Sequence, residues 1–501
     1  MKHFTAVKRS RQRPAARYRV PVLLLFTAVL VSACAPAAAV DGPTAQPGPT
    51  ATSIPVADGE QRQTVSGEVS VLINGVSVVD VEKGVVIPDQ MVAVEGERIA
   101  RIVPQAQVAV APDTRLVDGR GLYLMPGLVD AHVHDFDPEV FGRVLLANGV
   151  TLVRDMGMPT TQALELRQSA NSGTMPWPEM IVTGAVLDGY PPQIPDISFG
   201  LHTAADARVA VQKQAAAGVD QIKVYSDLDI GLLQAVIQEA HRLGLKVVGH
   251  VPEAIYLEDA VAAGQDGIEH LHGFPKVIGR LLGQPITLRR GGQGEDSQYW
   301  PRLPEVKRDE LQAVLRRLAD AGVVVCPTVV VFKNGAHFQA AIAGEHAGAE
   351  YISPGIRQVW RDVWASQTDV PEVIWRSMAA FVRELHEAGV PLLVGTDLLV
   401  PGIIPGYAVH EEMAIWQEAG IPAADVLRSA TIVPARFMGL DGRLGSIAEG
   451  KAASMVLVRA NPLEDIGHAQ EIEGVFLRGQ YFNRADLDGL LAEARELAGP
   501  K

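Results

Sequence analysis

Two histidines close a short apolar run early in the chain. The run Leu128–His134 follows the turn signal Met125-Pro126-Gly127 and reads as a β-strand. Because side chains alternate between the two faces of a strand, His132 and His134 point to the same side. Two imidazoles on one face can hold a metal ion. An isolated His-x-His is more often a pair of polar residues bonded to neighbours, so the interpretation depends on further ligands.

Further polar residues stand at or near the ends of later apolar runs, where they could complete such a site. They are Lys223, His250, His270 and Asp397. A lysine without a partner in a buried strand is energetically costly, so Lys223 needs an explanation. Each of these residues could be structural on its own. Taken together with the two histidines, coincidence is the weaker hypothesis.

The segments that must position these residues alternate between strand and helix. Short apolar runs separated by helical stretches are the pattern of a parallel α/β barrel, whose chemistry sits at the carboxyl ends of the strands. The expected strands are 128–134, 150–155, 180–183, 219–225, 246–250, 267–270, 323–328 and 391–397. The polar residues should therefore meet at one rim of the barrel.

A second unit flanks the barrel in sequence. Residues 67–124 contain short β-rich pieces separated by turn signals such as Asn74-Gly75, which predicts a small antiparallel sheet. We expect the barrel over residues 125–440, a return to the small β domain over 441–485, and a C-terminal helix or tail over 486–501.

The N-terminus has the pattern of an export signal. Residues 1–33 carry seven basic groups and no acid, and include the apolar run 20–31. The sequence Val31-Ser32-Ala33-Cys34 resembles the bacterial lipoprotein signal, which implies cleavage before Cys34 and lipidation of that cysteine. An ordinary secretory signal, with Cys34 incidental, is the alternative. Residues 34–66, rich in Ala, Pro, Thr and Gly, are expected to be a flexible tether. We therefore expect an exported protein, lipid-anchored on the periplasmic or cell-surface side of a bacterial membrane.

The amino-acid composition excludes some classes of binding partner. The chain has 501 residues, 48% of them hydrophobic, which is ample for a large core, and a formal net charge of −14. Loss of a leader that carries only basic groups increases this acidic excess. Such a charge repels phosphate backbones and anionic lipid, so we expect no nucleic-acid partner and membrane contact only through the lipid anchor. If Cys34 is acylated, Cys326 has no disulfide partner.

The order His-x-His, Lys, His, His, Asp resembles the amidohydrolase superfamily over about residues 67–485. The closest resemblance is to imidazolonepropionase-like hydrolases and Xaa-Pro dipeptidases that keep the lysine. The ending, with Gly445–Lys451 followed by Met455–Val458, looks like the return of that family to its small domain. Many relatives have Asp at or beside Ser454. The resemblance implies a (β/α)8 TIM-like barrel with a small β-sandwich domain formed from both ends of the mature chain.

The resemblance also implies a metal centre. Lys223 would be carboxylated by carbon dioxide, and its carbamate would bridge two divalent ions. One ion would be held by His132, His134 and Asp397 and the other by His250 and His270. Zinc suits these ligands best, although manganese, cobalt and iron are also compatible. Two ions lower the pKa of a bridging water, and Asp397 is the expected base for its proton and acid for the leaving group.

Several other residues admit two interpretations. Tyr225 and His272 are candidate substrate contacts, with packing or a bonded loop as the alternatives. Arg154 and Asp155, at the end of the second expected strand, are expected to pair internally, with substrate binding as the alternative. His410-Glu411 resembles the start of a zinc-protease helix, but the second histidine is missing, so exposed helix residues are expected. The insertions 274–306 and 332–376 could be lids or surface segments, and tryptophans in the second favour a packed helical cap.

The leading hypothesis is a metal-dependent hydrolase of an amide or peptide-like C–N bond, such as that of an Xaa-Pro dipeptide or an N-acyl amino acid. A second hypothesis is a one-metal cyclic-amide hydrolase or deaminase in which Lys223 is an ordinary lysine. A third is a non-catalytic surface binding lipoprotein, which the complete ligand set argues against. The partner is a small-molecule or dipeptide-like substrate, and assembly into a homo-oligomer stays open.

Overall fold

A computed structural model describes residues 63–64, 71–105, 108–109, 115–134, 137–289, 295–364 and 367–499. The predicted leader 1–33, the lipidation site Cys34 and all of the tether 34–66 except Gln63–Thr64 lie outside the described residues. Within the part of the chain that is described, no helix is both long and apolar enough to cross a membrane.

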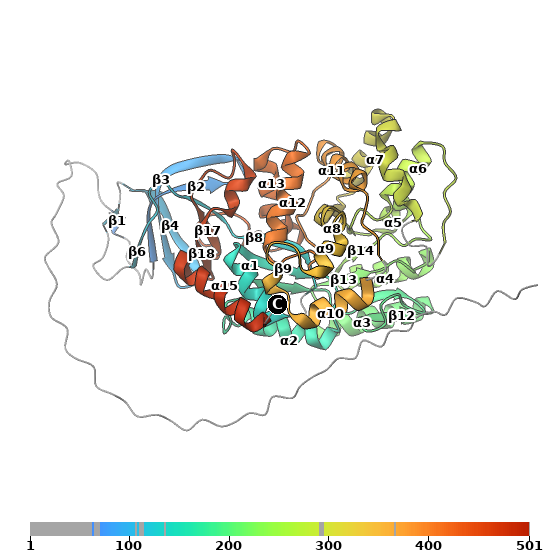
Figure 1. The fold of residues 1–501 in the computed structure, drawn as a ribbon, viewed down its shortest axis with the longest axis horizontal. Coiled ribbons are helices and arrows are strands. Elements are labelled where there is room, and N and C mark those ends of the chain that lie inside the picture. Colours follow the sequence, from blue (N-terminus) through green and yellow to red (C-terminus); the bar gives the residue numbers. More distant parts are fainter. Residues whose placement is uncertain are drawn as a thin grey trace, which may run out of the picture. The chain divides into compact units, whose positions relative to one another are not determined.

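Nine short parallel strands form the framework that positions the site (Figure 1). Apart from β12, these strands are buried or nearly so along their whole length, as expected for strands covered by helices. The first sheet has the order β10-β9-β8, and the second has the order β12-β11-β13-β14-β15-β16. The strands are β8 (Leu128–Val133), β9 (Val150–Asp155), β10 (Glu179–Val182), β11 (Val186–Gly189), β12 (Ser198–Leu201), β13 (Gln221–Val224), β14 (Lys246–Gly249), β15 (Gly267–Glu269) and β16 (Val324–Cys326).

Backbone hydrogen bonds join these two sheets into a ring. The Asp220 N–H donates to the Val182 carbonyl at 2.9 Å, which links β10 to the start of β13. Residues 391–397 form no regular strand, yet they bond to both neighbours. Leu393 donates to Val325 of β16 and Ala131 of β8 donates to Val394, each at 2.9 Å. The predicted barrel is therefore confirmed, with the eighth position occupied by an irregular segment.

Helices follow the strands and cover the ring. The helix α3 begins with a capping box, because Thr203 and Asp206 bond each other's backbone, and ends at Gly218 with φ 95°. The helices are α1 (Pro138–Ala147), α2 (Thr160–Asn171), α3 (Ala204–Ala217), α4 (Ile230–Arg242), α5 (Leu257–Ala263), α6 (Phe274–Leu281), α7 (Arg308–Asp320), α8 (Val329–Gly335), α9 (Phe338–Ala343), α10 (Pro354–Trp364), α11 (Glu372–Glu387), α12 (Tyr407–Glu418), α13 (Ala423–Ser429), α14 (Ile432–Phe437) and α15 (Arg484–Ala498), with 3-10 turns at Glu295–Glu305, Ala349–Tyr351 and Ile466–Gln470.

Strands from both ends of the chain share one sheet, in the order β19-β18-β17-β7-β2-β3-β4. Most pairs are antiparallel as predicted, but β2 pairs in parallel with β6 and β7. The strands are β2 (Val71–Asp80), β3 (Val85–Glu95), β4 (Arg98–Pro104), β6 (Arg115–Asp118), β7 (Tyr123–Pro126), β17 (Met455–Val458), β18 (Ile472–Leu477) and β19 (Gln480–Asn483), and the short pair β1 (Gln63–Thr64) and β5 (Val108–Ala109) stands apart.

The small sheet leads directly into the strand that carries the first histidines. Gly127 joins β7 to β8, and its N–H donates to the Ser454 carbonyl at 3.0 Å. A Cβ at Gly127 would lie 2.0 Å from the Thr151 hydroxyl, so only glycine fits at this close approach. The sheet thereby fixes the entry of β8 into the barrel.

The insertion 332–376 is a packed helical segment. Trp360 of α10 and Trp375 of α11 are buried, and the Trp360 indole donates to the Leu399 carbonyl at 2.8 Å. The prediction that His410 is exposed is wrong. His410 is only 4% exposed, and its Nε2 hydrogen-bonds the Asn148 carbonyl at 2.9 Å, because α12 packs that face inward.

A buried carboxyl fastens the irregular segment 391–397 to β8. Asp130 Oδ1 accepts hydrogen bonds from the backbone N–H of His132 at 3.2 Å and of Thr396 at 3.0 Å, and Oδ2 accepts one from the Thr396 hydroxyl at 2.7 Å. Burial raises the pKa of Asp130 to about 7. These bonds hold together the two segments that end in His132 and Asp397.

We predict that Thr396→Val destabilises the fold by about 1–3 kcal/mol, because it leaves one oxygen of buried Asp130 without its donor. Urea unfolding followed by circular dichroism measures this loss. Thr161→Val, on the exposed face of α2, is the matched control and should change stability by less than about 0.5 kcal/mol. Equal stability of the two variants would contradict the role given to Asp130.

Candidate metal centre

The residues predicted from five separate strands converge on one place. Ligand atoms of His132, His134 and Asp397 all lie within 4.8 Å of one another. Asp397 Oδ1 is 3.4 Å from Nε2 of both histidines, and its Oδ2 is 4.0 Å from Nδ1 of His270. Two imidazoles and a carboxylate at this spacing are a suitable set for one divalent cation.

The remaining predicted ligands stand beside this group. The His270 ring centroid is 4.4 Å from that of His132 and 5.2 Å from that of His250. Lys223, His250 and His270 line the same cavity as His134 and Asp397. The structure therefore brings all six predicted ligands together, with His132 fully buried behind the cavity wall.

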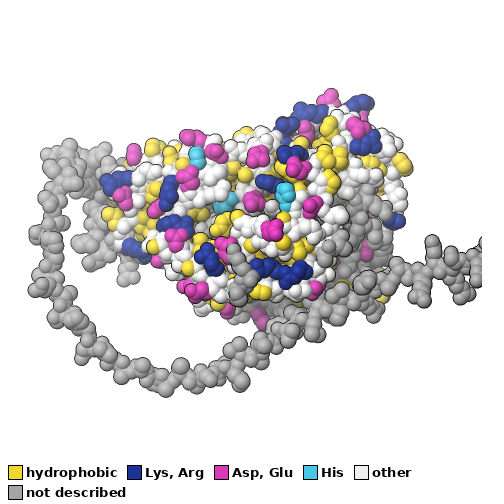
Figure 2. Space-filling model, viewed as in Figure 1, with side chains coloured by type: hydrophobic (Ala, Val, Ile, Leu, Met, Phe, Trp, Pro, Cys, Tyr) yellow, Lys and Arg dark blue, Asp and Glu magenta, His cyan; other side chains and the backbone are white. Residues whose placement is uncertain are grey.

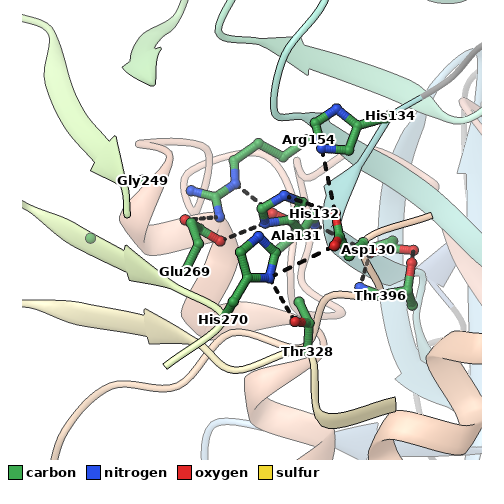
Figure 3. A network of polar contacts seen from close by, with 12 residues as sticks. Asp130, Ala131, His132, His134, Arg154, Gly249, Glu269, His270, Thr328 and Thr396 are labelled. Carbon is green, nitrogen blue, oxygen red and sulfur yellow. Dashed lines mark hydrogen bonds and ion pairs between the residues drawn. The ribbon is translucent and has the colours of Figure 1, made fainter. Parts of the chain in front are cut away.

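Each of the four histidines is held through its Nδ1 atom. The partner of His132 is a carboxylate oxygen of Glu269 at 2.7 Å, and the partner of His134 is the Gly157 carbonyl at 3.1 Å. His250 bonds the Ser226 hydroxyl at 2.8 Å. His270 bonds the Thr328 hydroxyl at 2.7 Å (Figure 3). Engagement of Nδ1 leaves Nε2 of each ring available as a ligand atom, which is how histidines are usually oriented for metal binding.

The Nε2 atom of His132 tests whether a cation fits here. It is buried and, among the described residues, has no hydrogen-bond partner. An unsatisfied buried nitrogen is costly, and a metal ion would satisfy its lone pair. The donor set of imidazole, carboxylate and amine therefore fits a divalent cation.

Arg154 and Glu269 support His132, although the sequence did not predict this role for either residue. Arg154 pairs inside the protein, as predicted, but its partner is Glu269 and not Asp155. It donates to Glu269 at 2.8 Å, and both side chains have no solvent exposure. Glu269 was not predicted. The sequence signal that could have identified it is a carboxylate at a strand end, directly before the predicted ligand His270. Asp155 instead lies near His134, and burial raises its pKa to about 6.

Three of the strand ends carry residues in the left-handed backbone region. The φ angles are 55° at His270, 48° at Thr328 and 56° at Asp397. Non-glycine residues in this region are uncommon and concentrate at functional sites. The turn at each of these positions ends the extended segment, and all three side chains take part in the site.

Burial keeps most of the ligands in forms that can bind a cation. It lowers the pKa of His132, His250 and His270 well below the usual value, so these rings are neutral at pH 7. Burial likewise lowers the pKa of Lys223 to about 8. Burial alone would raise the pKa of Asp397, but the nearby histidines, His270 foremost, outweigh it and hold the carboxyl ionised.

A second cluster, formed by His132, Glu269 and Cys326, is a weaker metal site. Glu269 is already neutralised by Arg154, and burial raises the pKa of the Cys326 thiol well above its usual value. A protonated thiol is a poor ligand, so the cluster around Asp397 is the better candidate.

The cavity in front of these ligands has a volume of about 250 Å³. Tyr225 and His272 line it, as predicted for substrate contacts, and the His272 ring stacks on His250 with centroids 3.8 Å apart. No described residue of the insertion 274–306 lines the cavity. Its outer wall includes Ile194 and Ile197, from a segment between β11 and β12 that was not predicted.

The sequence profile of the Amidohydrolase family matches residues 123–481. An uncharacterized protein of Mycobacterium tuberculosis is 25% identical over 385 residues, covering 72% of this chain and 86% of that protein. Adenine deaminase 3 of Rhizobium meliloti is 35% identical over 421 residues, covering 80% of this chain and 56% of that enzyme. Among solved structures, a bottromycin amidohydrolase has a TM-score of 0.68 and 26% identity, covering 85% of this chain and 90% of that chain. A putative prolidase from Bifidobacterium longum, at 23% identity and a TM-score of 0.59, shares the fold; the match covers 85% of this chain and 99% of that chain.

We predict that Ser226→Ala weakens zinc binding by roughly 10–100-fold, because His250 loses the partner of its Nδ1 atom. Competition with a chromogenic chelator measures the affinity. Ser169→Ala, on the exposed surface of α2, is the matched control and should leave the affinity unchanged. If both variants bind zinc as the wild type does, His250 is not a ligand.

Proposed function

This chain belongs to the Amidohydrolase family, and from that membership we propose that it hydrolyses an amide or peptide-like bond in the cavity beside Asp397. Amide hydrolysis and deamination both cleave a carbon–nitrogen bond with water, so the chain is a hydrolase of such a bond. The observation that carries the proposal is the convergence of four histidines, each held through Nδ1, with Lys223 and Asp397 around one cavity.

The family generally uses divalent metal ions, and two such ions suit this ligand set. His132, His134 and Asp397 would hold one ion, and His250 and His270 the other, with zinc as the preferred metal. When bound, the ions supply charge that polarises a carbonyl and lowers the pKa of water.

Lys223 would lie between the two positions as a carbamate. An ammonium cannot bind a cation, but a neutral amine can attack the carbon of carbon dioxide, lose a proton and present two anionic oxygens. Burial favours this reaction, because it lowers the pKa of Lys223 to about 8 and so increases the neutral fraction near pH 7. The deep position of Lys223, 1% exposed, protects the product from water.

Asp397 is the proposed proton carrier. It is the one carboxylate among the described residues that line the cavity. It would accept the proton of the attacking water and deliver it to the leaving nitrogen. Tyr225 and His272 would orient the substrate from the same wall, since both side chains reach the cavity.

Deamination is a second candidate, supported by the 35% identity to adenine deaminase 3. In that reaction the leaving group is ammonia and Lys223 remains an ordinary lysine beside one metal ion. The number of ions bound per chain separates this candidate from the first.

We predict that Asp397→Asn lowers kcat by roughly 10²–10⁴-fold, because an amide cannot carry the proton. The assay is a panel of Xaa-Pro dipeptides, N-acyl amino acids, neutral amides and adenine, with zinc-loaded protein. Asp441→Asn, at an exposed position, is the control and should retain full activity. Unchanged turnover in Asp397→Asn would contradict the assignment, and no turnover of any substrate by the wild type would favour a binding protein.

We also propose export and lipidation at Cys34, as the sequence Val31-Ser32-Ala33-Cys34 suggests. In a bacterial host, labelled palmitate should enter the wild type and Cys326→Ala but not Cys34→Ser. Equal label in Cys34→Ser would contradict the anchor.

A further inference from the structure

The cavity is lined by two chemically different groups of residues. One group comprises the histidines, Lys223, Tyr225 and Asp397. The other is apolar and comprises Met156, Val186, Ile194, Ile197, Val331 and Phe332. The reacting bond must lie near the first group, so the rest of the substrate meets the second.

Among the described residues, no arginine or lysine belongs to this apolar wall. Lys223 is the only lysine or arginine among the described residues that line the cavity, and the proposed function converts it to a carbamate. Outside the cavity lining, Arg154 is engaged by Glu269 at 2.8 Å and Lys276 by Glu253 at 2.6 Å. A carboxylate buried without a partner is costly, and the acidic net charge of the chain adds repulsion.

His272 does not supply the missing charge. Its Nδ1 atom is 3.7 Å from a carboxylate oxygen of Glu253, and its ring stacks on His250. The Glu253 carboxylate, which also pairs with Lys276 at 2.6 Å, lies beside His272 and would repel a substrate carboxylate there.

The apolar wall reaches the surface at the segment between β11 and β12. Ile194 lines the cavity and is also 39% exposed, which places it at the mouth. The neighbouring Tyr190 is exposed and stacks on His202 with ring centroids 3.9 Å apart. Because the cavity is small compared with typical ligand pockets of roughly 300–1,000 Å³, a larger apolar group would extend outward past Ile194.

Asp188 fixes this segment in place. It is fully buried, and its carboxylate accepts hydrogen bonds from the backbone N–H of Gly189 and Gln193 at 2.9 Å and of Asp227 at 2.8 Å. Asp227 follows shortly after Tyr225, so one side chain ties the apolar wall to the strand end that carries Lys223. These hydrogen bonds therefore hold the apolar wall in a fixed position relative to the rest of the site.

Figure 2 shows basic and acidic side chains interspersed over the face in view, without one large basic patch. An anionic substrate would find no broad attractive field on this face.

We propose that the substrate carries an uncharged apolar group where it contacts Ile194, Ile197 and Phe332, and no free carboxylate there. The preferred class is a neutral amide with an apolar substituent, in place of a dipeptide or an N-acyl amino acid. This inference rests on the proposed function and specifies its substrate.

A matched pair of amides tests the inference. N-phenylacetylpyrrolidine and N-phenylacetyl-L-proline share the scissile bond and differ only in the carboxylate. With zinc-loaded protein, kcat/KM should be at least tenfold higher for the pyrrolidine amide. Calorimetry on the Asp397→Asn protein gives a readout independent of turnover. This protein should bind the pyrrolidine amide at least tenfold more tightly than it binds the proline amide.

Introducing a cation at the mouth should reverse the preference. Ile194→Arg places a guanidinium at a partly exposed position, so it should raise the relative kcat/KM for the proline substrate at least tenfold. Val209→Arg, on the exposed surface of α3 and outside the cavity lining, should leave the ratio unchanged.

The outcomes are distinguishable. Equal or better use of the proline substrate by the wild type overturns the inference and leaves the proposed function standing. An unchanged ratio in Ile194→Arg also overturns it, because the wall would then not contact the substrate. No turnover of either amide, or of the wider panel, contradicts the proposed function and the inference with it.

Discussion

The site depends on one buried carboxylate, Glu269, that serves two partners. It accepts the Nδ1 proton of His132 at 2.7 Å and pairs with the Arg154 guanidinium at 2.8 Å. Arg154 also donates to the Ala131 carbonyl at 2.6 Å, so the pair joins β9 and β15 to β8 beside the first ligand. Breaking such a pair would leave a charge buried without compensation, which costs about 3–5 kcal/mol. The orientation of His132 is therefore built into the barrel core.

The same burial that holds the side chains also sets their charge. Burial lowers the pKa of His132, His250 and His270, so three neutral imidazoles stand near the ionised carboxylate of Asp397. Neutral rings offer nitrogen lone pairs, which are the form of histidine that binds a metal cation. The cavity in front of it is apolar on its outer wall, which strengthens electrostatic interactions near Asp397 by excluding water.

The ligands could be predicted from sequence because each stands at or near the end of an apolar run, and parallel strands bring their ends to one rim. The residues that orient these ligands could not be predicted from the sequence. Arg154 and Glu269 are 115 positions apart, and only the closed barrel brings them into contact. The strands β11 and β12 escaped prediction because each is four residues long and the segment between them contains three prolines, which read as a loop. His410 was misplaced because an incomplete motif gives no information about which helix face is buried.

Residues 391–397 show a further limit of pattern reading. Their apolar sequence predicts a regular strand, yet the segment bonds irregularly to β16 and β8 and turns at Asp397 with φ 56°. Asp130 makes this departure stable by accepting the Thr396 N–H at 3.0 Å. The irregularity lets the Asp397 carboxylate reach both His132 and His134.

Anomalous diffraction from zinc-loaded crystals tests the central claim most directly. We expect two anomalous peaks in the cavity, one bound by His132, His134 and Asp397 and one by His250 and His270, with density for a carboxyl group attached to the Lys223 nitrogen. A peak bound by Cys326 and Glu269 instead, or Lys223 and Asp397 turned away from every metal peak, would contradict the account.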